Sequence, residues 1–153
     1  MDDIKRILVV SRMTKYCRKA VHYGVSLARK YGAELYVIHV IHNPFGYEAW
    51  TLPIYSLKED YEKIQRKAKE DLDRIIASEK AEGLVVNELV RRGEPTEEIL
   101  KVVEDEGIDL MIMLAHEEWR LEHFLFCGAT EAIIRRMPCS IMLVKEELSA
   151  LPD

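Results

Sequence analysis

The chain has 153 residues, of which 48% are hydrophobic and 32% charged, and its formal net charge is -5. Its length fits a single domain, residues 1–153, with a substantial core. The acidic balance disfavours nucleic-acid or anionic-membrane partners. No apolar run reaches the ~18 residues of a transmembrane helix. With no apolar signal region before the first strand and only three scattered cysteines, we expect a cytoplasmic protein with reduced thiols.

The first half of the chain alternates short apolar runs with amphipathic segments. The run from Arg6 to Val10 predicts a fully buried strand. Thr14 can then cap a helix. The sheet-facing stripe of this helix recurs every three or four residues: Cys17, Ala20, Val21, Gly24, Val25 and Ala28. Gly32 supplies the left-handed stop, and residues 34–40 predict the next strand.

Residues 41–56 interrupt this pattern. Pro44, Gly46 and Pro53 indicate a long loop. This loop carries the aromatic residues Phe45, Tyr47, Trp50 and Tyr55. A long helix is predicted from about Leu57 to Glu82, and its inward stripe comprises Tyr61, Ile64, Ala68, Leu72, Ile75 and Ile76. We expect its many Lys and Glu residues to form a solvated face and nothing more.

The second half continues the alternation. Residues 84–91 predict an edge strand with one wetter face, and a helix follows from Pro95 to Gly107. Buried strands are predicted at 109–114 and 140–144, joined through a short helix at about 128–136. Five strands and four helices in strict alternation predict a doubly wound parallel α/β fold.

Taken together, several segments resemble the universal stress protein (UspA-like) family over nearly the whole chain. They are Ile7 to Val10, Gly32 to Val40, Arg91 to Leu100, Asp109 to Met113 and Met137 to Val144. The resemblance implies a Rossmann-like fold, similar to adenine nucleotide alpha hydrolases, with strand order 3-2-1-4-5 and helices on both faces. In some members a nucleotide lies where the first and fourth strands diverge.

The chain departs from the nucleotide-binding pattern of that family. Members that bind nucleotide carry Gly-x-x-Gly, nine residues, and then Gly-Ser or Gly-Thr. Those positions fall here on Leu114, Glu117, Cys127 and Gly128. Side chains therefore fill the space that phosphates need, and Glu117 adds like charge. The family's Asp-Gly after the first strand falls on Arg12 and Met13, so we expect the site to be lost and no cofactor to bind.

The alternative is a divergent ATP- or AMP-binding member that uses backbone contacts. The resemblance then implies a site formed by Val10, Ser11, Arg12, Val40, Met113, Leu114, Cys127 and Gly128. Arg12 also has two readings, an anion ligand at a helix N-terminus or an ion-pair partner of Glu117 or Glu118, and the second is favoured.

Loop residues suggest a third possibility, a small-ligand or metal-sensing module. His42, His116, His123 and Cys127 carry side chains that zinc or copper prefers. None of them stands at close ligand spacing, so polar loop residues without a metal are the favoured interpretation. The loop aromatics, including Trp119, more often cover a sheet edge than form a pocket, and Cys139 fits a small core residue.

The leading hypothesis is a stress-response or regulatory protein rather than an enzyme, with weak ATP hydrolysis as the exception to test. No nucleophile–base pair or phosphate loop stands at usable spacing. The final strand is apolar yet at the sheet's edge, so we expect a homodimer. Its interface would comprise Ser140, Ile141, Met142, Leu143 and Val144, with Met142 near the two-fold axis. The native ligand and any partner protein are not identified by the sequence.

Overall fold

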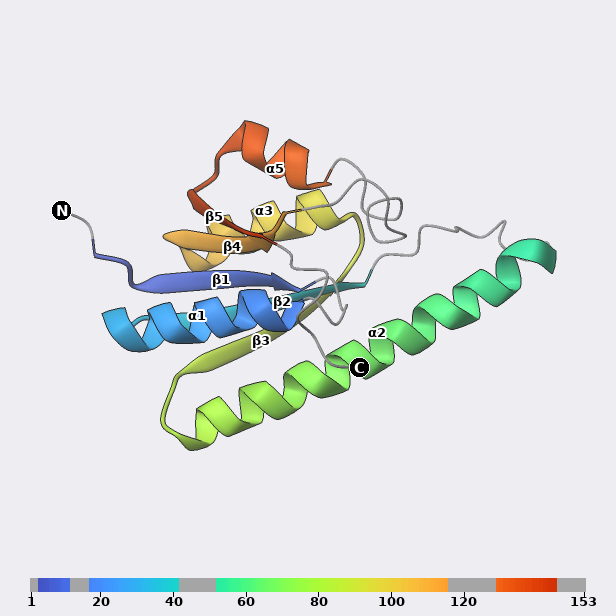
Figure 1. The fold of residues 1–153 in the computed structure, drawn as a ribbon. Coiled ribbons are helices and arrows are strands. Elements are labelled where there is room, and N and C mark those ends of the chain that lie inside the picture. The colour runs from blue at the N-terminus through green and yellow to red at the C-terminus, as the bar shows by residue number, and fades with distance from the viewer. Residues whose placement is uncertain (1–2, 12–16, 42–51, 116–128, 146–153) are drawn as a thin grey trace.

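A computed structural model describes residues 3–11, 17–41, 52–115 and 129–145. Five parallel strands form one sheet in the order β3-β2-β1-β4-β5, so the fold class and strand order predicted from the sequence are confirmed (Figure 1). In chain order the elements are β1 (Arg6–Ser11), α1 (Cys17–Tyr31), β2 (Glu34–Ile41), α2 (Leu52–Ala81), β3 (Val86–Arg92), α3 (Pro95–Glu106), β4 (Leu110–Leu114), α5 (Ala129–Arg136) and β5 (Ser140–Val144).

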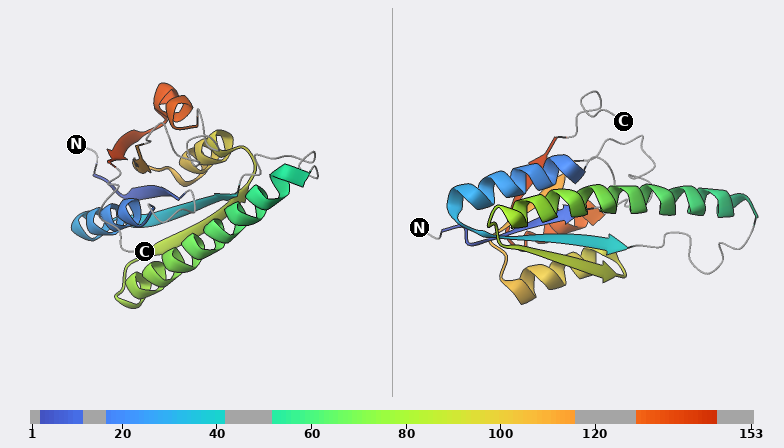
Figure 2. Two further views of the ribbon diagram at one scale, coloured as in Figure 1. Left: turned by 45° about the vertical axis from the view of Figure 1, so that its right-hand side comes forward. Right: turned by 90° about the horizontal axis from the view of Figure 1, so that it is seen from below.

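Helices cover both faces of the sheet, and the alternation of side chains along each strand divides the core in two. Helices α1 and α2 lie on one face, and α3 lies on the opposite face (Figure 2). Ile7 and Val9 of β1 pack with α1 and α2, whereas Leu8 and Val10 pack with α3 and α5. A strand buried on both faces needs a continuous apolar run, which is why β1 carries one. We call these the α1/α2 face and the α3/α5 face.

Helix α1 lies unusually close to the sheet at Gly24. A Cβ atom built there would stand 2.4 Å from Val9 Cγ2 and 3.1 Å from Leu35 Cδ1. Both neighbours are fully buried. The missing side chain of Gly24 therefore sets the distance between α1 and the central strands.

The acidic residue before β4 ties two strands together. One carboxylate oxygen of Asp109 accepts hydrogen bonds from the backbone N–H groups of Lys5 and Arg6, at 2.8 and 2.9 Å. The backbone N–H of Asp109 also donates to the Arg6 carbonyl at 3.0 Å. Asp109 thus fixes the register in which β4 enters beside β1, which gives this position of the family motif a structural role.

Capping residues mark the ends of the helices on the α3/α5 face. The Glu94 side chain caps α3 by accepting from the Glu97 N–H at 2.9 Å, and Gly107 closes the helix in the left-handed region at φ 62°. After α5 the same left-handed position, φ 42°, is occupied by Met137, a side chain that is 60% exposed. A non-glycine residue in that region carries a steric cost.

The largest error in a predicted boundary is at the start of the long helix, whereas β3 begins at Val86 rather than at residue 84. Helix α2 begins at Leu52 rather than Leu57. Pro53 lies in its first turn, where proline is tolerated because the first N–H groups of a helix have no internal partner. The expected loop of 41–56 is therefore shorter, and residues 42–51 lie outside the described part. The N-terminal end of α2 reaches well beyond the sheet (Figure 1).

The C-terminal half of α2 packs as the periodicity predicts. Leu72 and Ile76 are buried against the α1/α2 face, and Ile75 is half-buried. The side chains of Tyr61, Ile64 and Ala68 lie outside the described part of the structure. None of the described helices is long and apolar enough to cross a membrane.

Candidate functional site

The carboxyl ends of β1, β2 and β4 lie at one edge of the sheet, where ligands of doubly wound folds usually bind. The order β3-β2-β1-β4-β5 reverses direction between β1 and β4, which makes this the switch point. Of the residues predicted to contact a nucleotide, five are described here, and all are buried: Val10, Ser11, Val40, Met113 and Leu114. Arg12, Cys127 and Gly128 lie outside the described residues.

These five residues share the edge but not one surface. Val10, Val40 and Met113 belong to the core of the α3/α5 face. Leu114 belongs to the core of the α1/α2 face, and Ser11 follows Val9 on that same face by strand alternation. The structure therefore brings their strand ends together, whereas their side chains diverge into two cores.

Where the resemblance places the start of a phosphate-binding loop, the space and the backbone N–H are already used by the protein itself. Leu114, which is 6% exposed, ends β4 in register with Val144. The next backbone N–H, that of Ala115, donates to the Val144 carbonyl at 2.9 Å. A loop that binds phosphate needs free backbone N–H groups and open space beside them. Neither is offered at Leu114 and Ala115.

Most of the loop residues singled out from the sequence lie outside the described ranges. This applies to the histidine and cysteine candidates for metal binding, to the residues around the former glycine positions and to the loop aromatics: His42, His116, His123, Cys127, Arg12, Met13, Glu117, Glu118, Phe45, Tyr47, Trp50 and Trp119. The metal and aromatic-pocket hypotheses built on them stay predictions.

Strand β5 lies at the sheet's edge, next to β4. Its side chains are more apolar than those of an ordinary solvent-exposed edge strand. Leu143 is 47% exposed, and Ile141 and Met142 are half-buried, whereas Val144 is buried. Ser140 is exposed. Edge strands of monomeric proteins usually carry charge or proline to prevent pairing, and β5 carries neither.

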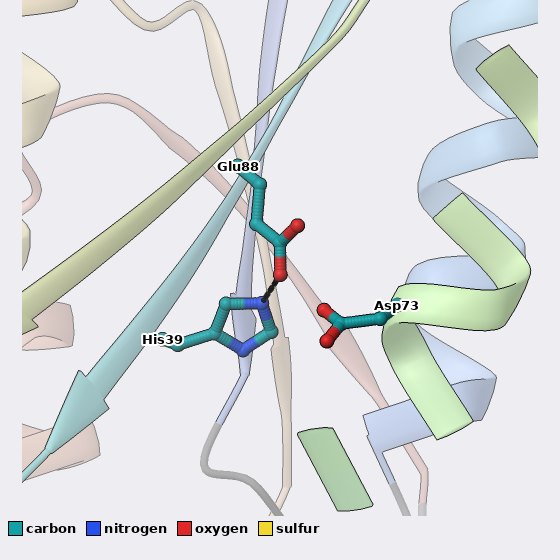
Figure 3. A group of neighbouring side chains, drawn as sticks. All are labelled: His39, Asp73 and Glu88. Carbon is teal, nitrogen blue, oxygen red and sulfur yellow. Dashed lines mark hydrogen bonds and ion pairs between the residues drawn. The ribbon is translucent and has the colours of Figure 1, made fainter. Parts of the chain in front are cut away.

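A cluster of polar side chains not predicted from the sequence lies under α2. His39 on β2, Glu88 on β3 and Asp73 on α2 point toward one another across the helix–sheet interface (Figure 3). His39 Nε2 contacts Glu88 Oε1 at 2.7 Å. The Lys69 ammonium lies 3.0 Å from both oxygens of Asp73 and 3.4 Å from Glu88 Oε1. We call these four residues the α2 polar cluster.

Burial decides the charge of the histidine. His39 is fully buried, and this desolvation lowers its pKa even though the adjacent Glu88 carboxylate acts in the opposite direction. The imidazole is therefore neutral at physiological pH. Beside a carboxylate, the neutral ring carries its proton on Nε2 and donates it to Glu88. Nδ1 is then a buried acceptor, and no described residue donates to it.

The two partly exposed charges in the cluster support each other. Burial alone raises the pKa of Asp73, but interactions with Glu88 and Lys69 outweigh it and the net direction is down. Burial likewise lowers the pKa of Lys69, while the hydrogen bond to Asp73 and the charge of Glu88 raise it, and the net direction is up. Both groups are therefore ionised at neutral pH.

The expectation that the Lys and Glu residues of α2 form only a solvated face is thus wrong for Lys69, which pairs with Asp73 and Glu88. Lys69 and Asp73 flank Leu72 on the side of α2 that meets the sheet. The sequence does indicate that Glu88 faces inward, because it lies two residues after the buried Val86 and alternate residues of a strand point to the same face. What the sequence lacks is any local spacing that joins β2, α2 and β3 at one place.

Strands wound in both directions from β1, with a switch point beside β4, define a doubly wound α/β protein of the Rossmann-like kind. The model of the universal stress protein family matches residues 3–145. The chain belongs to this family, and the resemblance noted from the sequence is confirmed.

Individual relatives agree with this assignment. The sequence is 32% identical over 87 residues to a universal stress protein of Methanocaldococcus jannaschii, which covers 57% of this chain and 54% of that protein. It is 30% identical over 115 residues to a universal stress protein of Aquifex aeolicus, which covers 71% of this chain and 82% of the relative. The aligned part thus spans about half the length of the Methanocaldococcus relative.

Solved structures share the fold at lower identity. The universal stress protein UspA from Lactobacillus plantarum matches with a TM-score of 0.69 and 17% identity, covering 94% of this chain and 99% of that one. A universal stress protein in complex with cAMP matches with a TM-score of 0.61 and 16% identity, covering 94% and 98%. These likenesses establish the common architecture.

Proposed function

We propose that this protein is a non-enzymatic regulatory member of the universal stress protein family that has lost high-affinity nucleotide binding. The observation that supports this most directly is at the end of β4. Leu114 stands where the resemblance expects the first glycine of the phosphate loop, its side chain is packed in the core, and the following N–H is used by β5. Phosphate oxygens would have to compete with both.

Nucleotide binding is the second candidate function, because a structural relative is known in complex with cAMP. The two candidates differ in a quantity that calorimetry measures. We expect ATP, AMP and cAMP to bind no more tightly than about 1 mM, or roughly 4 kcal/mol of binding free energy. A micromolar dissociation constant for any of them, or ATP that copurifies with the protein, would contradict the proposal.

A gain-of-function variant tests whether the loop is responsible. Leu114→Gly, Glu117→Gly and Cys127→Gly, combined with Arg12→Asp, restore the family pattern. We expect this variant to bind ATP at least tenfold more tightly than the parent, because backbone N–H groups and space become available. Arg12→Asp alone is the control, and it should leave the affinity unchanged.

We further propose that the protein is a homodimer that pairs through β5. The edge position of β5 and the exposed Leu143 support this, because an unpaired apolar edge exposes a row of backbone hydrogen-bonding groups. Two copies related by a two-fold axis would pair Ser140–Val144 antiparallel and satisfy both edges. A cytoplasmic location stays a prediction.

Sedimentation equilibrium distinguishes dimer from monomer at micromolar protein. We expect the parent to be dimeric and Met142→Lys to dissociate at least tenfold more readily, because like charges would face each other near the axis. Val90→Lys, on the opposite edge strand β3, is the matched control and should leave the dimer intact. A monomeric parent would refute the arrangement.

A further inference from the structure

The α2 polar cluster contains three groups that bind transition metals. An imidazole nitrogen and two carboxylates are the ligand types of three-ligand zinc sites that keep one position for water. One potential ligand atom from each of His39, Asp73 and Glu88 lies within 4.8 Å of the other two. In tetrahedral zinc sites, ligand atoms are roughly 3.4 Å apart. Reaching that spacing requires the side chain of Asp73, which is partly exposed on α2, to move inward, and the His39–Glu88 pair to open from its present 2.7 Å.

The buried histidine supplies an independent observation. His39 is 0% exposed, yet only one of its two ring nitrogens has a hydrogen-bond partner among the described residues. A buried polar atom without a partner costs stability, so such atoms in native proteins usually indicate a water, an ion or a catalytic role. The ring edge that carries Nε2 faces the two carboxylates (Figure 3). The His39 ring is therefore placed where a metal ligand has to be.

We propose that His39, Asp73 and Glu88 bind a divalent transition-metal ion, with zinc the best match, in competition with the Lys69 ammonium. Lys69 now takes the place of the cation between the two carboxylates. Its side chain is 35% exposed, so it can turn out into solvent. A metal ion can bind both carboxylates and the imidazole at once, whereas the Lys69 ammonium bonds only the carboxylates.

Metal on Nε2 moves the imidazole proton to Nδ1, on the side of the ring away from Glu88. Ligating histidines usually donate that second N–H to an acceptor. Ser11 lies in register with His39 on β1, the strand on the opposite side of β2 from β3, and it is buried. The Ser11 hydroxyl makes no hydrogen bond to Nδ1 in this structure, so metal binding would have to draw the two together for Ser11 to act as a positioning residue.

Equilibrium dialysis against zinc, with elemental analysis of the protein, measures the stoichiometry and the dissociation constant. We expect one zinc per chain for the parent. His39→Gln keeps a side-chain N–H for Glu88 but removes the ligating lone pair, so it should weaken binding at least tenfold. His22→Gln, at an exposed position on α1, is the matched control and should change nothing.

Lys69→Met gives the sharpest test. If the cluster were purely structural, removing Lys69 would not tighten zinc binding, whereas the proposal expects that it does. Removing the competing ammonium should tighten zinc binding by about tenfold. Lys69→Leu, which has no thioether, should tighten it equally, so that the gain cannot come from a new sulfur ligand. Ser11→Ala should weaken binding about tenfold, within the range seen for residues that orient metal ligands. Cobalt substitution adds a spectroscopic readout, since the visible bands of tetrahedral cobalt should appear in the parent and not in His39→Gln.

Two results would overturn the proposal. One is the absence of stoichiometric zinc from both the parent and Lys69→Met. The other is zinc that survives His39→Gln but is lost in His116→Ala, which would place the metal in the loops. If His39→Gln does not fold, Asp73→Asn on the helix surface replaces it, and retained tight zinc there counts against the site. The calorimetric test of nucleotide binding does not depend on any of these results, so the proposed function and the metal site can fail separately.

Discussion

Replacing Gly24 by alanine tests how tightly α1 is held on the sheet. The new methyl group would stand 2.4 Å from Val9 Cγ2, whereas carbon atoms in contact are normally about 3.5–4.0 Å apart. Val9 cannot turn away freely, because its branched side chain is fully buried. The new methyl group would also stand 3.1 Å from Leu35 Cδ1, so it cannot move away from Val9 toward Leu35.

Two effects of opposite sign set the size of the change. Adding a methyl group to a filled core costs about 1–3 kcal/mol. Alanine favours a helix interior over glycine by roughly 1 kcal/mol. The overlap exceeds 1 Å against Val9, so we expect the steric term to be near its upper limit. The net expectation is a loss of about 1–2 kcal/mol in the free energy of unfolding.

Urea unfolding followed by circular dichroism measures this difference. Parent and variant must be compared at one protein concentration, because dimerisation would make stability depend on it. The slope of the unfolding free energy against urea concentration should stay unchanged, while the midpoint of unfolding falls to a lower urea concentration. Ser26→Ala, at an exposed position of the same helix, is the control for helix propensity and should be neutral or slightly stabilising. A Gly24→Ala variant as stable as the parent would refute the reasoning.

Three further predictions concern the described residues. Met137→Gly should raise the unfolding free energy by about 0.5–1 kcal/mol, measured by urea unfolding, because glycine occupies the left-handed position after α5 without a Cβ clash. Asp109→Ala should lower it by about 1–3 kcal/mol, since two backbone N–H groups lose their acceptor, whereas an unchanged midpoint would show that water replaces the carboxylate. Burial raises the pKa of the Cys139 thiol. In a Cys17→Ser/Cys127→Ser background, iodoacetamide should therefore label Cys139 more slowly at pH 8 than it labels a free cysteine, and stability should fall as the pH rises through the unfolded-state pKa of about 8.5, because only the unfolded chain has then released the proton. Equal labelling rates would contradict this.

Strand positions were predicted well because burial on both faces leaves a clear sequence pattern. The range Ser140–Val144 is identical in prediction and structure. The start of α2 was missed because Pro53 suggests a break, although the first turn of a helix accepts proline. The family resemblance, rather than periodicity, supplied the strand order, since parallel strands can neighbour each other in many orders.

The α2 polar cluster could not be predicted from local spacing. His39 and Glu88 are 49 residues apart, and only the parallel pairing of β2 with β3 brings them together. Asp73 and Lys69 resemble the many exposed charges of α2, and only the direction in which Leu72 points shows that they face the sheet. Residues in separate elements require the tertiary arrangement before they can be grouped.

The central position of β1 has a consequence for how the chain is made. Its neighbours are β2, which follows closely, and β4, which begins about a hundred residues later, as the Arg6–Asp109 contact shows. At roughly 5–20 residues per second, a ribosome needs several seconds to deliver that second neighbour. During this interval one side of an apolar strand has no partner, and sheets with such distant pairings form slowly. Until β4 has emerged, the nascent chain should therefore leave open one edge of a strand that the finished form buries from Ile7 to Ser11.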